Sequence, residues 1–469
     1  MKTLKQKKDY FLETSKEYFH NYKKSRINFL FRKKKFFHEI SSFVNKCTHN
    51  STRSLYFCCG NSIIADNIKS KEKFIHEIDY DYLKSKKNKK ITLNKRLIHS
   101  CDHIIISDTE HQKNLISNLN IIQKNMNDNA RIILISKSLI WMGIINFFRK
   151  TFSFKKSLNT NFLPFKDLKS IFNNQNFEFI RNEKIIIFPF AIPLLNILLN
   201  TLFRLPILNF FCMMNVTIFK KKNIKKNQAK ISFIIPCKNE EDNIPLIEKT
   251  IPKTKKIIEF LFGNDKSKDA TKNKLVQLKK NLKKKCNIKI YEGPGICKSK
   301  NVYKGISLST GDIIVIYDAD LTVPIKNIFE AINTLNTSNI DFINCTRMIY
   351  PQKDHAMKKL NFLGNIFFAK LFSILFNQRI TDTLCGTKIF YKKDWEKIKI
   401  FNSTWGATDL WGDFDLLIGA YHLNLKIAEM PIPYQERIAN ETKMTSLISN
   451  TIRMIYIVLI AYFKLKIKK

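Results

Sequence analysis

Residues 311–323 read GDIIVIYDADLTV, and the rest of the chain is organised around them. Residues 313–317 form an apolar, mostly β-branched run, which is typical of a strand buried on both faces of a parallel sheet. Asp318 and Asp320 follow directly. Residues two apart in an extended chain project to the same side, so both carboxylates should face the carboxyl end of the strand. Open α/β sheets bind their ligands at that edge, which makes it the predicted functional site.

Two carboxylates at a strand end have two interpretations. Hard oxygen donors suit Mg²⁺ or Mn²⁺, and such an ion in turn binds a diphosphate. A lone Asp-Ala-Asp is also typical of a solvated turn that closes a strand. The neighbouring motifs have to decide between them.

Length and charge limit the classes of protein. The chain has 469 residues, enough for two or three domains with full hydrophobic cores. A net charge of +42 ordinarily indicates nucleic acid or an anionic membrane as partner. The excess is mostly lysine spread along the whole chain beside Asn, Ile and Phe, which indicates a coding bias more than a dedicated patch. Nucleic-acid binding is therefore disfavoured, and attraction to acidic lipid headgroups stays open.

The ten cysteines form no CxxC pair and have no regular spacing. Several lie in strand-like runs, where cysteine acts as a small buried hydrophobe. This argues against a zinc site or a disulfide framework and favours a reducing compartment. The first residues, MKTLKQKKDYFLETSKEYF, lack the apolar core of a signal peptide, so we expect a cytoplasmic location.

The sequence of the N-terminal half predicts two parts, which are a basic helical segment over 1–50 and an α/β domain over 51–218. SLYFCCGNSIIADNI (54–68) contains a strand-like run, a glycine and a helix-like segment. DHIIISDTEH (102–111) and ARIILIS (130–136) are further strands. The βαβ rhythm predicts a doubly wound parallel sheet.

This order and spacing resemble a class I S-adenosylmethionine-dependent methyltransferase. The resemblance implies that Gly60 is the glycine of the cofactor loop and that Asp79 binds the ribose hydroxyls of S-adenosylmethionine. The match is incomplete, because the family's other loop glycines fall on Cys58 and Ser62 and its acidic residue before the loop falls on Tyr56. Two interpretations stay open: a weakened methyltransferase, or a domain retained as scaffold.

Residues 185–203, IIIFPFAIPLLNILLNTLF, approach the length of a membrane-spanning helix. Pro189 and Pro193 interrupt them, which favours a buried strand followed by a helix that starts at a proline. The lysine-rich FKKKNIKKNQAK (219–230) is the expected linker between two domains.

Three strand–loop–helix units follow the linker, in ISFIIPCKNEEDNIP (231–245), IEFLFGNDKSKDAT (258–271) and the residues 287–312. Each brings a polar loop to the same edge of the sheet. Together they predict a nucleotide-binding half that ends in the strand before Asp318.

These motifs resemble a family-2 glycosyltransferase with the GT-A fold, in the branch of dolichol-phosphate mannosyltransferase, over residues 231–450. The resemblance is carried, in order, by IIPCKNEEDNI, GNDKSKDAT, GPGICKSKNV, YDADLTV, TDTLCGTKIF and PIPYQERIANET. It implies a metal-dependent, inverting enzyme that moves a sugar from a nucleotide-sugar to a polyprenyl phosphate or a cell-envelope glycan. Mg²⁺ or Mn²⁺ on Asp318 and Asp320 would stabilise the leaving diphosphate. Thr322 stands where this branch often has a glutamine.

The resemblance also assigns the donor site. Nucleotide-sugar binding would fall to Pro236, Asn239, Glu240, Asn264, Asp265, Lys298, Asp318, Arg347 and Arg437. For Glu240 the alternative is a helix N-terminus, and for Lys298 it is a solvated lysine. Arginine matches phosphate oxygens in pairs, as lysine does not, so Arg347 is expected on a donor or acceptor phosphate.

Asp413, Asp382 and Arg347 are the candidate catalytic residues. By resemblance Asp382 shapes the floor where sugar meets acceptor, beside Gly386. For a hydroxyl acceptor Asp413 is the expected general base, whereas a lipid phosphate is already ionised and needs none. The alternative role of Asp413 is to cap a helix.

The C-terminal residues 451–469 predict a basic amphipathic helix. The apolar run 454–463 is too short to cross a bilayer as a helix, so we expect it to lie in the membrane interface, with the enzyme peripheral on the inner face of the cell membrane. Two further hypotheses remain. One is a bifunctional enzyme that also methylates the glycan or lipid; the other is a basic nucleic-acid-binding protein, against which the scattered lysines argue.

Overall fold

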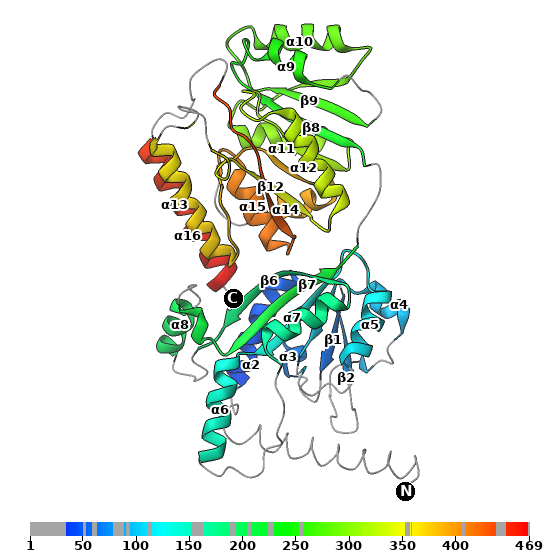
Figure 1. Ribbon diagram of the computed structural model, residues 1–469, viewed down its shortest axis with the longest axis vertical. Coiled ribbons are helices and arrows are strands. Elements are labelled where there is room, and N and C mark those ends of the chain that lie inside the picture. Colours follow the sequence, from blue (N-terminus) through cyan, green and yellow to red (C-terminus); the bar gives the residue numbers. More distant parts are fainter. Residues whose placement is uncertain are drawn as a thin grey trace. The chain divides into compact units, whose positions relative to one another are not determined.

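The computed structural model divides the chain into an N-terminal unit up to Lys222 and a C-terminal unit from Asn223. Both units are α/β, as the sequence predicted (Figure 1). The structure describes residues 34–49, 53–58, 63–77, 89–90, 94–107, 109, 115–151, 163–187, 193–203, 208–223, 229–252, 257–351, 357, 359–404, 409–437 and 447–467.

The N-terminal unit has a seven-stranded sheet in the order β3-β2-β1-β4-β5-β7-β6. Its strands are β1 (Arg53–Cys58), β2 (Glu72–Glu77), β3 (Lys89–Lys90), β4 (His103–Ile106), β5 (Arg131–Lys137), β6 (Phe177–Ile185) and β7 (Met214–Lys221). Strand β7 runs antiparallel to both of its neighbours. The sheet is therefore doubly wound, as the sequence predicted, but mixed and not purely parallel, because β7 is reversed.

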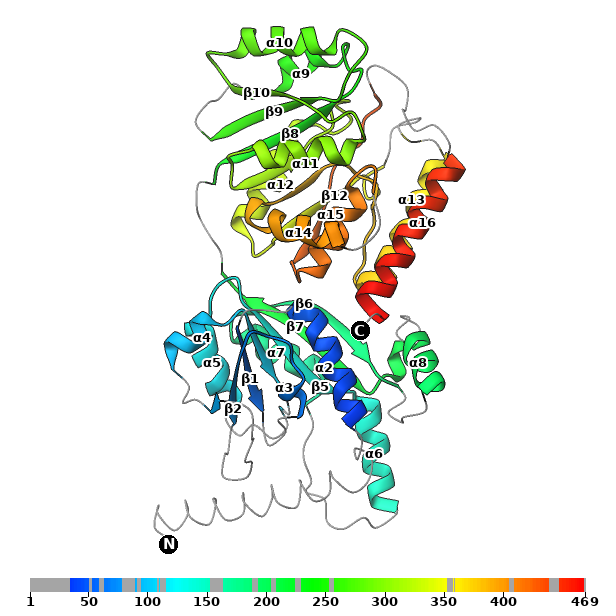
Figure 2. The ribbon, with the colours of Figure 1, turned by 180° about the vertical axis from the view of Figure 1, so that it is seen from behind.

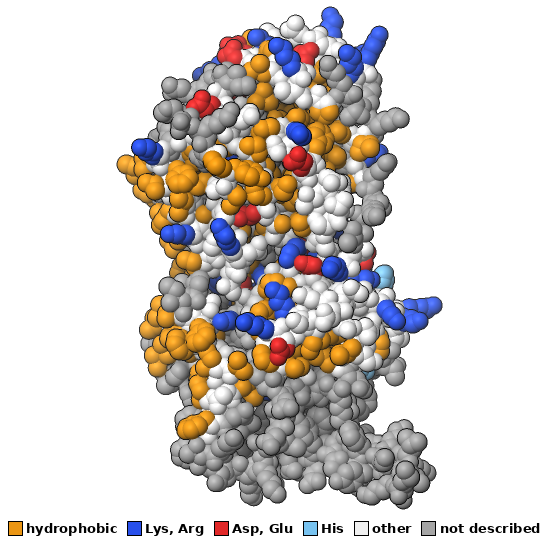
Figure 3. Space-filling model, viewed as in Figure 1, with side chains coloured by type: hydrophobic (Ala, Val, Ile, Leu, Met, Phe, Trp, Pro, Cys, Tyr) orange, Lys and Arg blue, Asp and Glu red, His pale blue; other side chains and the backbone are white. Residues whose placement is uncertain are grey.

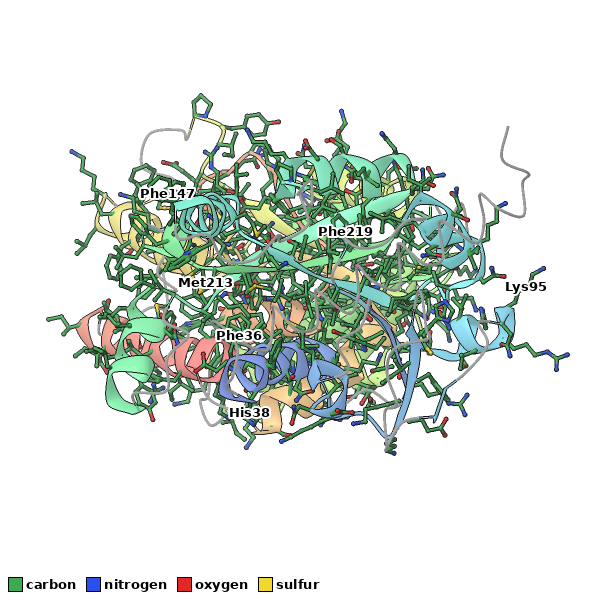
Figure 4. The ribbon with its side chains drawn as sticks, turned by 90° about the horizontal axis from the view of Figure 1, so that it is seen from below. Phe36, His38, Lys95, Phe147, Met213 and Phe219 are labelled. Atoms are coloured by element: carbon green, nitrogen blue, oxygen red, sulfur yellow. The ribbon has the colours of Figure 1, made fainter. Side chains whose placement is uncertain are left out.

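Helices cover both faces of this sheet. Helices α2 (Lys34–Thr48) and α3 (Ile63–Asp66) pack on one face, and α4 (Lys95–Ser100), α5 (Leu115–Asn125) and α7 (Phe165–Asn174) pack on the other. The two cores are separate, with Phe36 in one and Phe219 in the other (Figure 4).

Two boundaries differ from those expected, and a third agrees. Helix α2 buries Phe36 and Phe37 in the first core, so it is part of this unit and not a separate basic segment. Strand β7 includes residues 219–221, which were expected in the linker. Helix α8 (Pro193–Leu202) begins at Pro193, as the sequence predicted. Helix α6 (Leu139–Thr151) and the 3₁₀ turn η2 (Asn209–Phe211) complete the unit.

The C-terminal unit has a second seven-stranded sheet, in the order β10-β9-β8-β11-β13-β12-β14. Its strands are β8 (Ile231–Cys237), β9 (Ile258–Asn264), β10 (Asn287–Glu292), β11 (Ile313–Ile316), β12 (Phe342–Thr346), β13 (Lys388–Tyr391) and β14 (Ile427–Pro431). Among the strands that the structure describes here, only β13 runs against its neighbours β11 and β12. Strand β11, the predicted apolar run, is buried on both faces between β8 and β13.

Helices again form a layer on each face (Figure 2). One face carries α9 (Ile244–Thr250), α10 (Thr271–Leu282) and α12 (Ile325–Thr337). The other carries α11 (Lys298–Leu308), α13 (Lys359–Phe376), α14 (Lys392–Thr404), α15 (Asp413–His422) and α16 (Leu447–Tyr462), which continues as η3 (Phe463–Ile467).

Helices α13 and α16 lie side by side in both views (Figures 1 and 2). They are long and apolar enough to cross a membrane by length and composition, over Lys359–Phe376 and Ile448–Lys466, with mean hydropathies of 1.3 and 1.4. The helix expected at the C-terminus is thus longer than the ten apolar residues suggested, and the sequence did not predict α13. Helices α13 and α16 each pack one side into the core. In α16 this side includes Met454 and Ile457.

A buried carboxylate anchors the amino end of β11. Glu259 of β9 accepts hydrogen bonds of 2.5 Å from Ser232 Oγ and from the backbone N–H of Thr310, and its other oxygen lies 2.8 Å from Lys289 Nζ. Burial alone would raise the pKa of Glu259, but Lys289 and the two hydrogen bonds outweigh it and the pKa is lowered. The strand that carries Asp318 is thereby fixed to its neighbours at its starting end.

We predict that Glu259→Ala lowers the free energy of unfolding of the C-terminal unit by about 2–4 kcal/mol, because it leaves the buried Ser232 hydroxyl and the part-buried Thr310 N–H without their acceptor. Urea denaturation followed by tryptophan fluorescence measures this. The matched control is Glu248→Ala, which removes only an exposed hydrogen bond from Asn281 and should cost about 0.5 kcal/mol or less. Equal losses in the two variants would contradict the anchoring role.

Candidate active site

One edge of the C-terminal sheet gathers the predicted site residues. The parallel strands β8, β9, β10, β11, β12 and β14 all end at this edge. Because β13 is antiparallel to β11 and β12, it begins there. Motifs that are far apart in the sequence therefore meet at a single edge.

Asp318 and Asp320 follow the end of β11, and each is paired with a cation. Lys298 Nζ, from the first residue of α11, lies 2.6 Å from Asp318 Oδ1. Arg437 Nη2 lies 3.1 Å from Asp320 Oδ2. Asp320 Oδ1 accepts hydrogen bonds from the backbone N–H and hydroxyl of Thr322, at 3.3 and 2.9 Å. The structure thus brings together four of the predicted residues, and Thr322 supports one of the acids.

The turn that holds the two acids is strained, and a hydrogen bond runs across it. Leu321, between Asp320 and Thr322, has a φ of +56°, a conformation that bulky residues rarely adopt. Such strain costs about 1–3 kcal/mol and persists only where the surroundings enforce it. The Tyr317 hydroxyl donates a 2.9 Å hydrogen bond to the Val323 carbonyl across the turn. This is not the solvated turn of the alternative interpretation, and Asp320 is only 15% exposed.

The ion pair of Lys298 with Asp318 holds both groups in their charged forms. Burial by itself would lower the pKa of Lys298 and raise that of Asp318. Asp318, Asp413 and Asp320 outweigh burial and raise the pKa of Lys298. Lys298, with Arg347 and Arg437, outweighs it for Asp318 and lowers that pKa. Lys298 is therefore a fixed positive charge beside the two acids.

Gly386 leaves room for this pair. A β-carbon at this position would clash with Asp318 Oδ2 and stand 2.6 Å from Lys298 Nζ. Glycine is the residue that lets backbone approach so closely. Because Gly386 leads into β13, the reversed strand forms one wall of the site.

The loop after β8 is joined to the loop after β9. The Asn239 N–H donates to Ser267 Oγ at 3.0 Å, and Asn239 Oδ1 accepts from the N–H of Lys268 at 2.9 Å. Glu240 Oε2 accepts from Asn243 Nδ2 at 2.6 Å, just before α9. This contact joins two side chains ahead of α9 and does not cap the helix backbone, and nucleotide binding by Asn239 and Glu240 stays a prediction.

The ends of β8 and β9 lie side by side, with Pro236 opposite Gly263. Asp265 is buried, and its Oδ1 accepts a 2.7 Å hydrogen bond from the N–H of Gly295, in the loop before α11. Asn264 Nδ2 donates to Glu292 Oε2 at 2.9 Å. These residues connect three neighbouring loops at the site.

Arg347 and Asp382 form a closed pair. Arg347 Nε and Nη2 lie 2.8 and 3.0 Å from the two oxygens of Asp382, and the Arg347 N–H donates to the same carboxylate at 3.0 Å. The guanidinium carbon lies 5.0 Å from the centre of the Tyr434 ring. We expected the Arg347 guanidinium to bind phosphate. One of its edges instead binds the carboxylate of Asp382.

Asp382 is fully buried, and three further contacts complete its surroundings. Its Oδ1 accepts from Asn365 Nδ2 of α13 at 2.8 Å and from the N–H of Leu384 at 3.0 Å, and its own N–H donates to Glu429 Oε1 at 3.3 Å. Burial would raise the pKa of Asp382, but Arg347 outweighs it and the pKa is about 2. A catalytic role for Asp382 stays a prediction; its contacts hold Arg347 and tie α13 to the site.

Asp413 has the properties of a base. It is the first residue of α15, and its side chain is 11% exposed. Lys388 Nζ, which is fully buried, lies 3.6 Å from Asp413 Oδ1 and donates to Asn344 Oδ1 at 3.1 Å. Burial raises the pKa of Asp413 to about 6, although Lys388 and Lys298 lower it in part. A carboxylate with this pKa is ionised at neutral pH and readily accepts a proton.

Helix capping, the alternative role of Asp413, belongs to another residue. Asp409 Oδ2 accepts hydrogen bonds from the N–H groups of Phe414 and Asp415, at 2.8 and 3.2 Å. Asp415 Oδ2 accepts from the hydroxyl of Tyr303, at 3.0 Å. Asp409 therefore satisfies the start of α15 and leaves the carboxylate of Asp413 at the site.

Sequence reasoning missed Lys388, Asp409 and Asn365. A lysine that begins the apolar strand β13 was an available signal, because buried lysines are rare unless they are paired. Asp409 and Asn365 gave no local signal, since their partners are set by the tertiary fold. Gly60 and Asp79, the predicted S-adenosylmethionine residues, lie outside the described residues.

The two acids fit a divalent cation of the kind that takes few protein ligands. Within the described ranges, no group of three or more His, Cys, Asp or Glu side chains converges to hold a metal. Mg²⁺ is commonly bound through one or two carboxylates, with substrate phosphates and water completing the shell. Asp318 and Asp320 supply that donor set, and the cations paired with them are well placed to compensate phosphate charge.

Residues 232–399 match the protein family described as Glycosyl transferase family 2. The dolichyl-phosphate hexose transferase of Haloferax volcanii is 30% identical over 132 residues, which cover 28% of this chain and 54% of that protein. The prophage bactoprenol glucosyl transferase homolog of Escherichia coli is 33% identical over 101 residues, which cover 21% and 32%. The chain thus spans about half of the first relative and about a third of the second.

Among solved structures, the chain is similar to a glucosyl-3-phosphoglycerate synthase of Mycobacterium tuberculosis in complex with Mn²⁺ and uridine diphosphate. The TM-score is 0.39 at 14% identity, over 51% of this chain and 80% of that one. The family match covers the strands β8 to β13 and the acids that follow β11. Residues 232–399 of this chain are a family-2 glycosyltransferase domain.

Proposed function

We propose that the protein transfers a sugar from a nucleotide-sugar to a polyprenyl phosphate, with inversion at the anomeric carbon and with the help of Mg²⁺ or Mn²⁺. The observation that carries this proposal is the strained turn after β11. It holds two carboxylates beside Lys298 and Arg437, at the sheet edge where α/β folds bind nucleotides.

The residues of the site would have different roles in the reaction. Lys298 and Arg437 place positive charge beside Asp318 and Asp320, where they would bind the diphosphate of the donor. A bound divalent cation would supply Lewis-acid stabilisation of the leaving diphosphate. Asp413 would take the proton of a hydroxyl or water nucleophile, whereas an ionised lipid phosphate needs no base. Arg347, held by Asp382, would keep a fixed charge near the incoming acceptor.

Two observations support a lipid phosphate as the acceptor. The relatives include a dolichyl-phosphate hexose transferase and a bactoprenol glucosyl transferase homolog, whose names specify polyprenyl acceptors. Helices α13 and α16 each bury one side in the protein and expose apolar residues on the other, such as Leu363 (61%) and Ile452 (63%). Figure 3 shows apolar side chains gathered over these helices.

A helix with one side packed on protein and the other apolar and exposed lies along a membrane surface more readily than across it. Asn365 of α13 contacts Asp382, so this surface is joined directly to the site. We therefore propose a protein that is peripheral on the inner face of the cell membrane, with α13 and α16 in the lipid interface. A polyprenyl phosphate would then reach the site from the bilayer.

We predict that Asp318→Asn and Asp320→Asn each lower metal-dependent donor turnover about 10²–10³-fold, because a preorganised charge at the leaving group is lost. The assay is a screen of nucleotide-sugars for hydrolysis with Mn²⁺, with Mn²⁺ binding measured by calorimetry. Asp312→Asn is the matched control, since Asp312 lies at the other end of the strand and accepts from the Lys230 N–H. Donor turnover that a chelator leaves unchanged would contradict the proposal.

We predict that donor hydrolysis by the wild type increases as the pH rises through about 6, because Asp413 accepts a proton only when it is ionised. Asp413→Asn should reduce hydrolysis about 10²-fold and remove this rise, but should reduce transfer to polyprenyl phosphate much less. Asp415→Asn, two residues along the helix, should keep the rise. Loss of both reactions to the same extent would show that Asp413 acts on the donor and not as a base.

The strand order of the N-terminal sheet favours a second candidate function for that unit. A seven-stranded sheet with one reversed strand, β7, next to its edge fits the class I methyltransferase resemblance. Tyr56 is buried at the position of the family's acidic residue, and its hydroxyl lies 2.9 Å from Ser107 Oγ. We propose that this unit binds S-adenosylmethionine weakly and that Tyr56 accounts for the weakness.

Titration calorimetry of the full chain with S-adenosylmethionine should therefore give a small saturable heat that Asp79→Asn removes, because Asp79 would bind the ribose hydroxyls. Asp66→Asn, a change at the end of α3, is the control and should leave the heat intact. Absence of heat at high ligand concentration would leave the scaffold interpretation.

A further inference from the structure

The N-terminal unit exposes an apolar patch that its core does not account for. We call it the α6–η2–α8 patch. It consists of Leu139, Ile144 and Phe147 of α6, Leu195, Leu198 and Leu202 of α8, and Phe210 and Phe211 of η2. Each of these side chains is more than a third exposed, with Phe147 at 64%, Phe210 at 56% and Leu198 at 55%. Monomeric soluble proteins rarely expose so many large apolar side chains together.

Three contacts make the patch continuous. The Trp141 indole N–H of α6 donates a 2.5 Å hydrogen bond to the Phe211 carbonyl. The rings of Phe203, directly after α8, and Phe211 are 6.2 Å apart between centres, and Phe210 packs against Phe211 at 5.6 Å. The turn η2 therefore joins α6 to the end of α8. Phe147 lies at the rim of the unit in Figure 4, away from the sheet.

The opposite side of α8 is hydrogen-bonded to the rest of the unit, so the orientation of its exposed side is fixed. Asn200 is buried, and its Nδ2 donates to Glu39 Oε2 of α2 at 3.1 Å. Its Oδ1 accepts from the N–H of Ile187 at 2.8 Å. The leucines at 195, 198 and 202 follow helical spacing on the exposed side.

The patch has the residue types of a membrane interface. The sequences of α6, α8 and η2 contain no Asp or Glu. Lys184 Nζ lies 5.6 Å from the centre of the Phe210 ring, so a cation borders the aromatic part. Tryptophan, phenylalanine and lysine are the residues that combine apolar burial with attraction to anionic headgroups.

We infer that the α6–η2–α8 patch binds the surface of an anionic lipid bilayer. Charge favours this partner over a second copy of the chain, because two copies that each carry a net charge of +42 repel one another, whereas acidic headgroups attract the chain. The inference does not depend on sugar transfer, since the patch and the proposed active site belong to different units.

Trp141 of α6 provides a probe beside the patch, because its indole is hydrogen-bonded to Phe211. We expect its fluorescence in the full-length protein to be quenched by vesicles of phosphatidylcholine and phosphatidylserine with brominated acyl chains. Trp395 and Trp411 belong to the core of the C-terminal unit, and the difference between the wild type and Trp141→Phe isolates the signal of Trp141. Quenching should weaken with added salt and with phosphatidylcholine alone. Equal quenching of wild type and Trp141→Phe would overturn the inference.

A pair of variants separates the patch from other lipid contacts. Leu198→Asp with Phe210→Asp should abolish the Trp141 quenching and lower vesicle partitioning at least about tenfold, since two apolar side chains no longer enter the interface. The control is Ile116→Asp, which changes an exposed residue (54%) of α5 in the same unit and should leave both intact. Donor hydrolysis in detergent should be the same in all three proteins.

Two results would contradict the assignment. Undiminished Trp141 quenching in the double variant would place the lipid contact elsewhere. A doubled mass in light scattering that the double variant restores to a monomer would make the patch a contact between copies. Failure of the sugar-transfer proposal would appear instead as absent donor hydrolysis with normal vesicle binding.

Discussion

The active site depends on carboxylates that the fold removes in part or entirely from water and places beside lysine or arginine side chains. Asp318 pairs with Lys298, Asp320 with Arg437, Asp382 with Arg347 and Asp413 with Lys388. An unpaired charge removed from water costs several kcal/mol, so each acid needs its partner. The acids come from the loops after β11 and before β13 and from the start of α15, and the sheet order brings them together. The reversal of β13 is essential, because it delivers Gly386 and Lys388 to the edge where the parallel strands end.

The four ion pairs differ in solvent exposure. This difference distinguishes a pair that holds the structure of the site from pairs that a ligand can reach. Asp382 has no exposed surface and two of its contacts to Arg347 form a fork, so a ligand cannot displace either group without breaking a buried pair. Asp318 and Lys298 are 31% and 28% exposed, and phosphate or metal can reach them. The buried pair of Asp382 and Arg347 thus holds the structure of the site. The exposed pair of Asp318 and Lys298 is available to bind a charged ligand.

The sequence predicted the parts of the site that depend on local pattern. Residues 313–317 gave the buried strand, and the spacing of Asp318 and Asp320 gave the two acids on one turn. It predicted Lys298 and Arg437 by resemblance, but not that they would pair with these acids. Lys388, Asp409 and Asn365 act through partners far along the chain, and no local pattern encodes such pairings. For the same reason the reversal of β7 and β13 was not predicted, since strand direction depends on how each connection crosses the sheet.

Two buried aspartates acquire opposite properties from their surroundings. Asp382 receives a guanidinium fork, an amide and a backbone N–H, and its pKa is about 2. Asp413 has Lys388 at 3.6 Å, too far for a strong hydrogen bond, and burial, helped by the nearby Asp409 and Asp318, raises its pKa to about 6. A group that is held ionised by its neighbours can only position, whereas a group whose two states are close in free energy near neutral pH can transfer a proton. The contacts of Asp382 therefore fit a structural role, and those of Asp413 fit the proton transfer that we propose for it.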